Sequence, residues 1–356
     1  MNKPTERTLF PLPESARPEP QVRVKDTLTY TAASTFQTCR RKFLHRYVNG
    51  LVPVVKQHAL AFGSVTHQWL EVWHRTRSQV EAQSVIDAAY VNRGSDRDER
   101  HAWHYQTAML KGYAAQYAAE DFEIVALEKE FAGPLRNPAP GGLPSRSFVF
   151  RGKVDGILRR GDSFILFESK TAGTLTGDYI ERLGLDMQIL SYAHFVREVL
   201  QYPVTSIIYN VLVKPRLVQA EGETEEQYSQ RKAALEAASK TGKPSSAKRK
   251  LPETDDEFQA RLADWFAAEP RFTRIELILD FDAVENVRRT LWGISKEILA
   301  ARKSDGWHQS PKACVSFGRC PYFELCVSKD NPAVIENLYR REPPHSELEE
   351  KAEEAF

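Results

Sequence analysis

The chain has 356 residues, of which 42% are hydrophobic and 27% are charged, an ordinary globular composition with enough apolar material for a sizeable core. No stretch approaches 18 uncharged apolar residues, and the N-terminus lacks the apolar region of a secretory signal, so we expect a cytoplasmic protein that does not enter a membrane. The net charge of +1 specifies no partner, and any nucleic-acid surface would therefore be local.

The first third of the chain is predicted to be helical. Residues 1–28, rich in proline and polar residues, are expected to form a disordered N-terminal arm. A helix should follow with Ser34 as its N-cap, and further helical patterns at 61–74 and 79–120 complete a helical part over 29–120. Residues 40–46, RRKFLHR, carry four positive charges and no acid. This pattern is typical of a solvated helix face and also of a nucleic-acid contact.

The middle of the chain changes to a strand-rich pattern. Residues rich in β-branched and aromatic types at 122–133, 148–160, 163–170 and 205–213 predict strands, with an amphipathic helix at 178–200, and together they form a core over 121–213. A polar insert is expected at 214–270, followed by a strand and a helix over 271–303. A cysteine-bearing segment at 304–330 and a frayed acidic tail at 331–356 end the chain.

The sequence RRGDS predicts a hairpin between the second and third strands. A two-residue turn at Gly161 and Asp162 would place Asp155 directly opposite Glu168, with Cβ atoms roughly 4.5–5.5 Å apart. Because side chains alternate along a strand, Lys170 would lie on the same face as Glu168.

Two opposed carboxylates destabilise a sheet unless something neutralises them. A divalent cation such as Mg²⁺ would do so and would retain waters for chemistry on phosphate. Lys170 could then orient or deprotonate a water, or stabilise a pentavalent phosphate. The alternative is a solvent-facing hairpin in a different register, which would remove the pairing.

The pattern of Gly152, Asp155 and then Glu168-x-Lys170 after twelve intervening residues resembles the core of the PD-(D/E)XK nuclease superfamily. This resemblance implies an α/β fold in which a restriction-endonuclease-like mixed β-sheet is flanked by helices.

Other motifs resemble the RecB-like branch of that superfamily. A G-x-x-x-H motif ends at His67, which the resemblance makes a metal ligand, and a Q-x-x-x-Y motif is formed by Gln188 and Tyr192. An acid on the preceding strand also recurs in the branch, and either Glu128 or Glu130 could correspond to it.

The four cysteines follow the pattern of iron–sulfur members of this branch, which take one ligand from near the N-terminus and three from a C-terminal cluster. Here these are Cys39, followed by Cys314, Cys320 and Cys326. The resemblance implies a [4Fe-4S] cluster held by four thiolates. A zinc site is the main alternative, and unmetallated thiols are the other. The spacing from Cys314 to Cys320 is longer than in CRISPR-associated members.

Together these features predict a Mg²⁺- or Mn²⁺-dependent DNA exonuclease of phage or bacterial recombination or repair, acting on linear ends or single strands, with possible recombination or repair proteins as partners. No P-loop motif is present, so no helicase motor is expected in this chain. The alternatives are a CRISPR-adaptation-type nuclease and a catalytically inactive DNA-binding scaffold.

The expected metal ligands are His67, Asp155, Glu168 and the Ser169 carbonyl. Lys170, Gln188 and Tyr192 complete the catalytic set, and Arg40, Arg41 and Lys42 would contact DNA.

Overall fold

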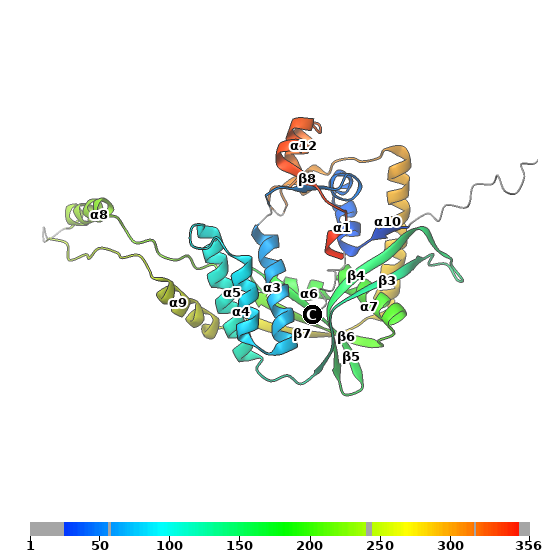
Figure 1. Cartoon of the computed structure of the whole chain (residues 1–356), viewed down its shortest axis with the longest axis horizontal. Helices are drawn as coiled ribbons and strands as arrows, with labels where there is room; N and C mark the ends of the chain where they lie inside the picture. Colours follow the sequence, from blue (N-terminus) through cyan, green and yellow to red (C-terminus); the bar gives the residue numbers. More distant parts are fainter. Residues whose placement is uncertain (1–24, 56–57, 240–243, 317, 349–356) are drawn as a thin grey trace, which may run out of the picture.

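A six-stranded mixed sheet forms the centre of the protein in the computed structural model, which describes residues 25–55, 58–239, 244–316 and 318–348. Helices cover both faces of the sheet (Figure 1). The strand order is β1-β4-β5-β6-β7, and β3 pairs with β4 along its other edge. The strands are β1 (Asp26–Leu28), β3 (Glu123–Arg136), β4 (Pro144–Arg160), β5 (Ser163–Ala172), β6 (Val204–Val213) and β7 (Phe272–Ile278). This confirms the predicted α/β class.

The β4–β5 hairpin has the predicted register. Arg160 pairs with Ser163, and Gly161 in the turn has a φ of +60°, which glycine adopts readily. The ladder ends at Gly156 and Phe167, one step before Asp155 and Glu168. Beyond that point β5 continues in parallel with β6, while β1 pairs with β4 at the earlier residues 148–150. The two hairpin strands therefore diverge where the acidic residues stand.

One face of the sheet carries the larger apolar core. It is covered by helices that bury Tyr192, Phe195, Leu291 and Ile298 against strand residues such as Leu166. The covering elements are α1 (Tyr30–Thr38), α6 (Gly177–Leu183), α7 (Met187–Phe195) with a π-helical turn (Val196–Leu200), and α10 (Phe281–Ser304).

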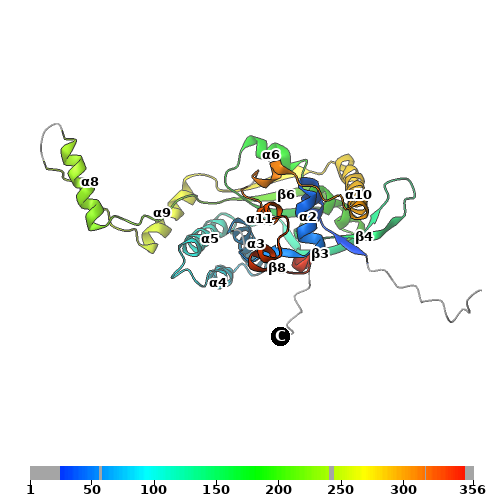
Figure 2. The same cartoon turned by 90° about the horizontal axis from the view of Figure 1, so that it is seen from above.

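The other face is covered by a helical layer with its own core around Trp69, Met109 and Tyr113. The elements are α3 (His58–Thr76), α4 (Gln79–Ala89), α5 (Arg97–Gln116) and α9 (Asp255–Ala268). Figure 2 shows this layer and the α6–α10 layer on opposite sides of the strands. Among the described residues, no helix is both long and apolar enough to cross a membrane.

Segments from the N-terminal and C-terminal parts of the described chain pack together into a small cap. β2 (Leu51–Pro53) pairs antiparallel with β8 (Tyr339–Arg341), and Leu51, Tyr322 and Leu325 form a separate apolar cluster. The remaining cap elements are α2 (Arg40–Phe43), a π-helical turn (Leu44–Val48), α11 (Phe323–Val327), α12 (Pro332–Leu338) and 3-10 turns at Pro311–Cys314 and Ser346–Leu348.

The polar insert forms an arm that projects from the body, with α8 (Glu225–Ala237) near its far end and α9 at its base (Figures 1 and 2). α8 buries no residue, whereas α9 buries Phe258, Leu262 and Phe266 against α5. A capping box starts each helix, at Thr224 and at Thr254.

Several boundaries differ from those predicted. Asp26–Leu28 form strand β1 instead of a disordered arm, because Leu28 fills the core; residues 1–24 lie outside the described chain. The first helix begins at Tyr30 with Thr29 as its N-cap, not Ser34. The helix predicted over 178–200 is two helices, separated at Gly184. The tail predicted as frayed from 331 instead supplies α12 and β8, and only 349–356 of it lie outside the described residues.

Candidate active site

The site is built where β4 and β5 separate. Asp155 lies next to Gly156, where the hairpin ladder ends. Its Oδ2 accepts a hydrogen bond of 2.7 Å from the Ser169 amide across the gap between the strands. His67 reaches the same oxygen from α3, with its Nδ1 at 3.2 Å. Gly63, one turn earlier on α3, lies over Thr171, so that a Cβ there would be 3.8 Å from the Thr171 hydroxyl. The glycine and histidine of the G-x-x-x-H motif thus bring α3 onto the separating strands.

Glu128 completes a compact donor group with His67 and Asp155. One ligand atom from each of the three lies within 4.8 Å of the others, and this is the one such group of three His, Cys, Asp or Glu residues found in the described part of the chain. β3 pairs with β4 so that Glu128 falls opposite Asp155, and Glu128 has a φ of +48°. Such left-handed backbone at a non-glycine residue costs energy and clusters at functional sites. A nitrogen and two carboxylates suit a divalent cation.

Glu130, the other acid considered on this strand, lies elsewhere. Its Oε2 is 3.6 Å from the Arg151 guanidinium, and it takes no part in the donor group. The structure therefore distinguishes two acids that the sequence left equivalent.

Glu168 faces a second set of groups. Its Oε1 accepts hydrogen bonds from Lys170 Nζ at 2.6 Å and from Gln188 Nε2 at 2.9 Å, and Lys170 also donates to Gln188 Oε1 at 2.7 Å. Glu168 is only 3% exposed. The predicted residues on β5 and α7 therefore meet in one closed triangle beside the donor group, and Glu168 itself lies outside that group.

Tyr192 supports this triangle from one turn further along α7. Its hydroxyl interacts with Gln188, and its ring packs edge-on against Phe131 at 5.5 Å. A Cβ at Gly152 would come within 2.9 Å of the Tyr192 ring and 2.6 Å of Phe131. Gly152, three residues before Asp155, is thus required for the close packing of Tyr192 and Phe131 against β4.

The charges of the site perturb one another. Burial alone would lower the pKa of His67, but Asp155 outweighs burial and raises it to about 9. Burial would raise the pKa of Asp155, but His67 and the Ser169 amide hold it below its usual value. Burial, reinforced by Asp155, raises the pKa of Glu168 to about 7. Burial would lower the pKa of Lys170, but Glu168 raises it, so Lys170 is a stable cation.

Three further residues at the site were not identified from the sequence. Lys153 forms an ion pair with Glu128, and Tyr30 of α1 lies close enough to Lys170 and Glu168 to feel their charges. Asn210 on β6 donates to the Ser169 hydroxyl at 3.2 Å and is fully buried with its Oδ1 unpaired. Only Lys153 had a usable signal, since it stands two residues before Asp155 and so on the same face of β4.

The four cysteines line one cavity of about 210 Å³ between the N-terminal helices and the C-terminal segment. Burial raises the pKa of Cys326 to about 11 and also that of Cys320, and the neighbouring cysteines add to both shifts. No three of their sulfur atoms lie within 4.8 Å of one another. A single tetrahedral zinc would require sulfur separations of roughly 3.8 Å, given its bond lengths of about 2.3 Å.

Two of the three predicted DNA-contacting cations form ion pairs within the protein. Arg40 pairs with Glu297 of α10 at 2.8 Å, and Arg41 pairs with Asp330 beyond α11. Lys42 lines the cysteine cavity. The two arginines connect the N-terminal helices to the rest of the molecule, and the DNA contact of the three residues stays a prediction.

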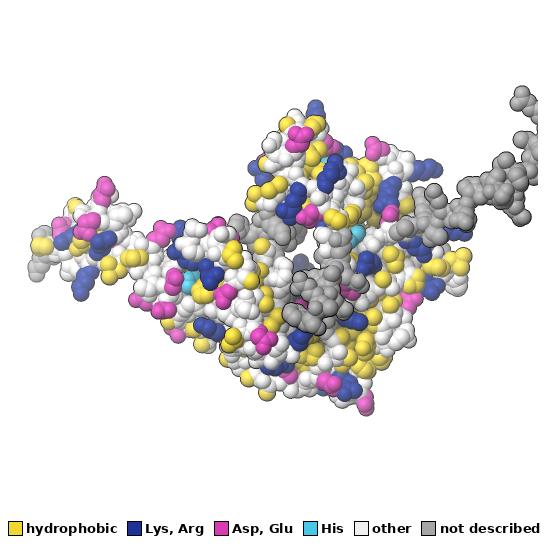
Figure 3. Space-filling model, viewed as in Figure 1, with side chains coloured by type: hydrophobic (Ala, Val, Ile, Leu, Met, Phe, Trp, Pro, Cys, Tyr) yellow, Lys and Arg dark blue, Asp and Glu magenta, His cyan; other side chains and the backbone are white. Residues whose placement is uncertain are grey.

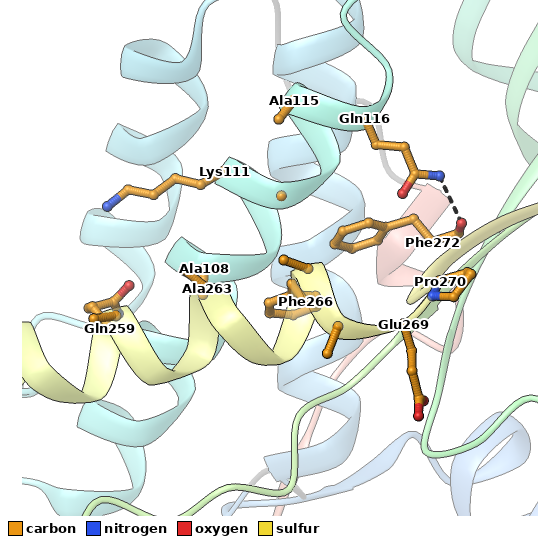
Figure 4. A pocket seen from close by; sticks show the side chains of 14 residues that line it. Ala108, Lys111, Ala115, Gln116, Gln259, Ala263, Phe266, Glu269, Pro270 and Phe272 are labelled. Atoms are coloured by element: carbon orange, nitrogen blue, oxygen red, sulfur yellow. Dashed lines mark hydrogen bonds between the residues drawn. The ribbon is translucent and has the colours of Figure 1, made fainter.

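A large cavity lies away from the candidate active site. It measures about 960 Å³ between α5 and α9, and its wall is made mainly of Ala and Phe side chains, with Gln116 bonded to the Phe272 carbonyl (Figure 4). Over the face drawn in Figure 3, basic and acidic side chains are interspersed, in keeping with the near-zero net charge.

Comparison with known proteins agrees with this geometry. A family model described as the PD-(D/E)XK nuclease superfamily matches residues 27–327, which is most of the chain. The protein therefore belongs to the PD-(D/E)XK nuclease superfamily. Among curated proteins no match was found.

Proposed function

We propose that this protein is a Mg²⁺- or Mn²⁺-dependent DNA exonuclease of the RecB-like branch, acting in phage or bacterial DNA recombination or repair. The observation that carries the proposal is the donor group of His67, Glu128 and Asp155 beside a partly buried lysine held by Glu168. Exonuclease activity and the biological context rest on the motif resemblance.

The donor set suits a hard divalent cation because it combines one imidazole nitrogen with carboxylate oxygens. His67, Glu128 and Asp155 would hold the ion, with Glu168 and the Ser169 carbonyl as further candidates. When bound, the ion would polarise a phosphoryl oxygen and lower the pKa of a bound water.

Lys170 acts as a fixed cation in this proposal. Its raised pKa disfavours the deprotonated form that a general base requires, so orienting the attacking water and balancing charge on the phosphate are the roles that remain. Glu168 and Gln188 set the position of its ammonium group, and Tyr192 positions Gln188.

The test is cleavage of linear DNA with Mn²⁺. Lys170→Met should lower kcat by about 10²–10³-fold, the scale of losing one charge-stabilising group. Lys296→Met, which removes an exposed lysine from α10, is the matched control. Glu128→Gln should abolish cleavage whereas Glu130→Gln should not. Equal rates in the Lys170 and Lys296 variants would refute the assignment. Resistance of circular single strands would support an exonuclease over an endonuclease.

A [4Fe-4S] cluster at Cys39, Cys314, Cys320 and Cys326 is the second part of the proposal. The shared cavity supports it, because all four cysteines line that cavity and four thiolates are the ligand set of such a cluster. The cluster would bind the N-terminal helices to the C-terminal segment. Protein purified without oxygen should contain iron and acid-labile sulfide and absorb in the visible range. Cys39→Ser should lose both; stoichiometric zinc without iron would refute the cluster.

A further inference from the structure

A cleft with both basic and acidic side chains on its wall lies beside the candidate active site. It measures about 610 Å³ and is bordered by the start of α3, by α5, and by the segments that follow β5 and β6. Two cations, Lys214 and Arg216, lie on its wall just after the end of β6. The Lys214 amide donates to the Ala172 carbonyl at 2.8 Å, which fixes this segment against the end of β5.

Lys214 and Arg216 have no acidic partner within the described residues. Neither side chain is in a salt bridge or a side-chain hydrogen bond in that part of the chain. Asp98 and Glu99 belong to the α5 wall of the cleft, but neither pairs with the two cations, and Glu99 is bonded to Asn92. Burial lowers the pKa of Lys214, and Arg216 lowers it further. Two adjacent cations in a partly buried cleft are unfavourable unless an anion joins them.

Contacts with α3 and α5 position the segment that carries the two cations. Lys214 Nζ lies 5.6 Å from the centre of the Phe62 ring, a cation–π contact. The Arg216 guanidinium lies across the end of β5, where a Cβ on Gly173 would be 2.8 Å from it. Tyr105 of α5 donates its hydroxyl hydrogen to the Leu217 carbonyl, which anchors the segment after β6.

The cleft is close to the candidate active site. Gly173 on its border is three residues beyond Lys170, roughly 10 Å at about 3.3 Å per residue of extended chain. Phe62, also on the border, is just over one turn from His67 on α3. The border of the cleft therefore lies close enough to the donor group for one extended polymer to contact both.

We propose that Lys214 and Arg216 form a phosphate-binding subsite for the DNA strand whose scissile bond lies at the donor group. The inference rests on the proposed nuclease function and adds the path of the substrate to it. The ligand is a backbone phosphate of a single strand, and the half-buried ring of Tyr105 on the cleft border offers a surface on which a neighbouring base can stack.

The experiment compares Lys214→Met/Arg216→Met with the control Lys296→Met/Lys303→Met, which removes two exposed charges from α10. With single-stranded DNA and Mn²⁺, the subsite variant should raise KM about tenfold and leave kcat within about twofold, since a cation that neutralises a backbone phosphate strengthens binding uniformly across sequences. The slope of log KM against log salt should fall by roughly 0.7 for each phosphate that the variant no longer neutralises. A KM and a salt slope equal to those of the control would overturn the subsite.

Two further measurements keep the outcomes separate. Arg216→Met alone, at an exposed position, should show part of the same effect if the double variant fails to fold, as judged by its circular dichroism. Fluorescence anisotropy with a labelled single strand and EDTA measures binding without cleavage. If the wild type binds DNA but does not cleave it, the proposed function fails. The subsite is then supported by weaker binding of the double variant than of the control, and refuted by equal binding.

Discussion

At the scale of single residues, the ability of the donor group to bind a cation depends on whether His67 is protonated. The ring lies 3.2 Å from the carboxylate, and although burial would lower its pKa, Asp155 raises it to about 9 from an ordinary 6.5. A divalent cation takes the neutral ring, so binding must release that proton.

This proton competition predicts a pH dependence. A histidine with a raised folded pKa stabilises the fold fully below pH 6.5, and this contribution is lost as the pH rises towards 9. The metal-free protein should therefore lose stability over that range, while the increase in Tm caused by Mn²⁺ should grow. Thermal unfolding in EDTA and in Mn²⁺ from pH 6 to pH 9 measures both.

The control for this experiment is His67→Gln, which should flatten the dependence of the Mn²⁺ effect on pH above 7. Glu168, with its pKa raised to about 7 from 4.5, also destabilises the metal-free fold as pH rises, but over a lower range. A Mn²⁺-induced shift in Tm that is the same at pH 6.5 and pH 9 would contradict the proposed role of His67.

At the scale of elements, the contact between α7 and the sheet depends on Gly152. α7 presents Tyr192 to β4, and a side chain at Gly152 would overlap the Tyr192 and Phe131 rings. Both rings are buried, and a movement of the Tyr192 ring would disturb the contact between its hydroxyl and Gln188.

Gly152→Ala should therefore destabilise the protein by roughly 1–3 kcal/mol, the cost of overpacking a core. Gly293→Ala on α10 is the control: nothing lies within 4 Å of its added Cβ, and alanine in a helix interior should stabilise by about 0.5–1 kcal/mol. Thermal unfolding should show a lower Tm for the first variant and an equal or higher Tm for the second. Equal values would mean that α7 shifts without cost.

At the scale of the whole molecule, the arm that carries α8 is separable from the nuclease body. The segments that enter and leave the arm meet at its base, where Glu253 donates its amide hydrogen to the Ala220 carbonyl at 2.8 Å. α8 buries nothing, and a helix of this length is marginal by itself in water. The ion pairs of α8, such as Arg231 with Glu223, lie within the arm, and the pair of Arg97 on α5 with Glu221 joins two exposed side chains.

Replacing residues 221–252 with a short glycine linker should thus change Tm by less than about 2 °C, as for exposed surface changes. Leu262→Ala in α9 is the contrasting variant, because Leu262 is fully buried and its loss should cost about 2–5 kcal/mol. If the deletion lowers Tm as much as Leu262→Ala does, the arm supports the body in a way that its exposed surface does not reveal.

Much of this protein follows from local sequence. The turn at Gly161 and Asp162 determines the hairpin register, because a two-residue loop leaves one pairing, and the alternation of side chains places Lys170 beside Glu168. Strand composition likewise predicted β3 to β7 to within a few residues.

Tertiary structure decided the rest. The divergence of β4 and β5 leaves Asp155 facing His67 instead of pairing with Glu168, and no local pattern encodes where two strands part. The choice of Glu128 over Glu130 depends on an unusual backbone angle and on pairing with β4. The engagement of Arg40 and Arg41 by Glu297 and Asp330 joins residues hundreds of positions apart. Periodicity and turn chemistry act over a few residues, whereas these contacts form only once distant segments have packed.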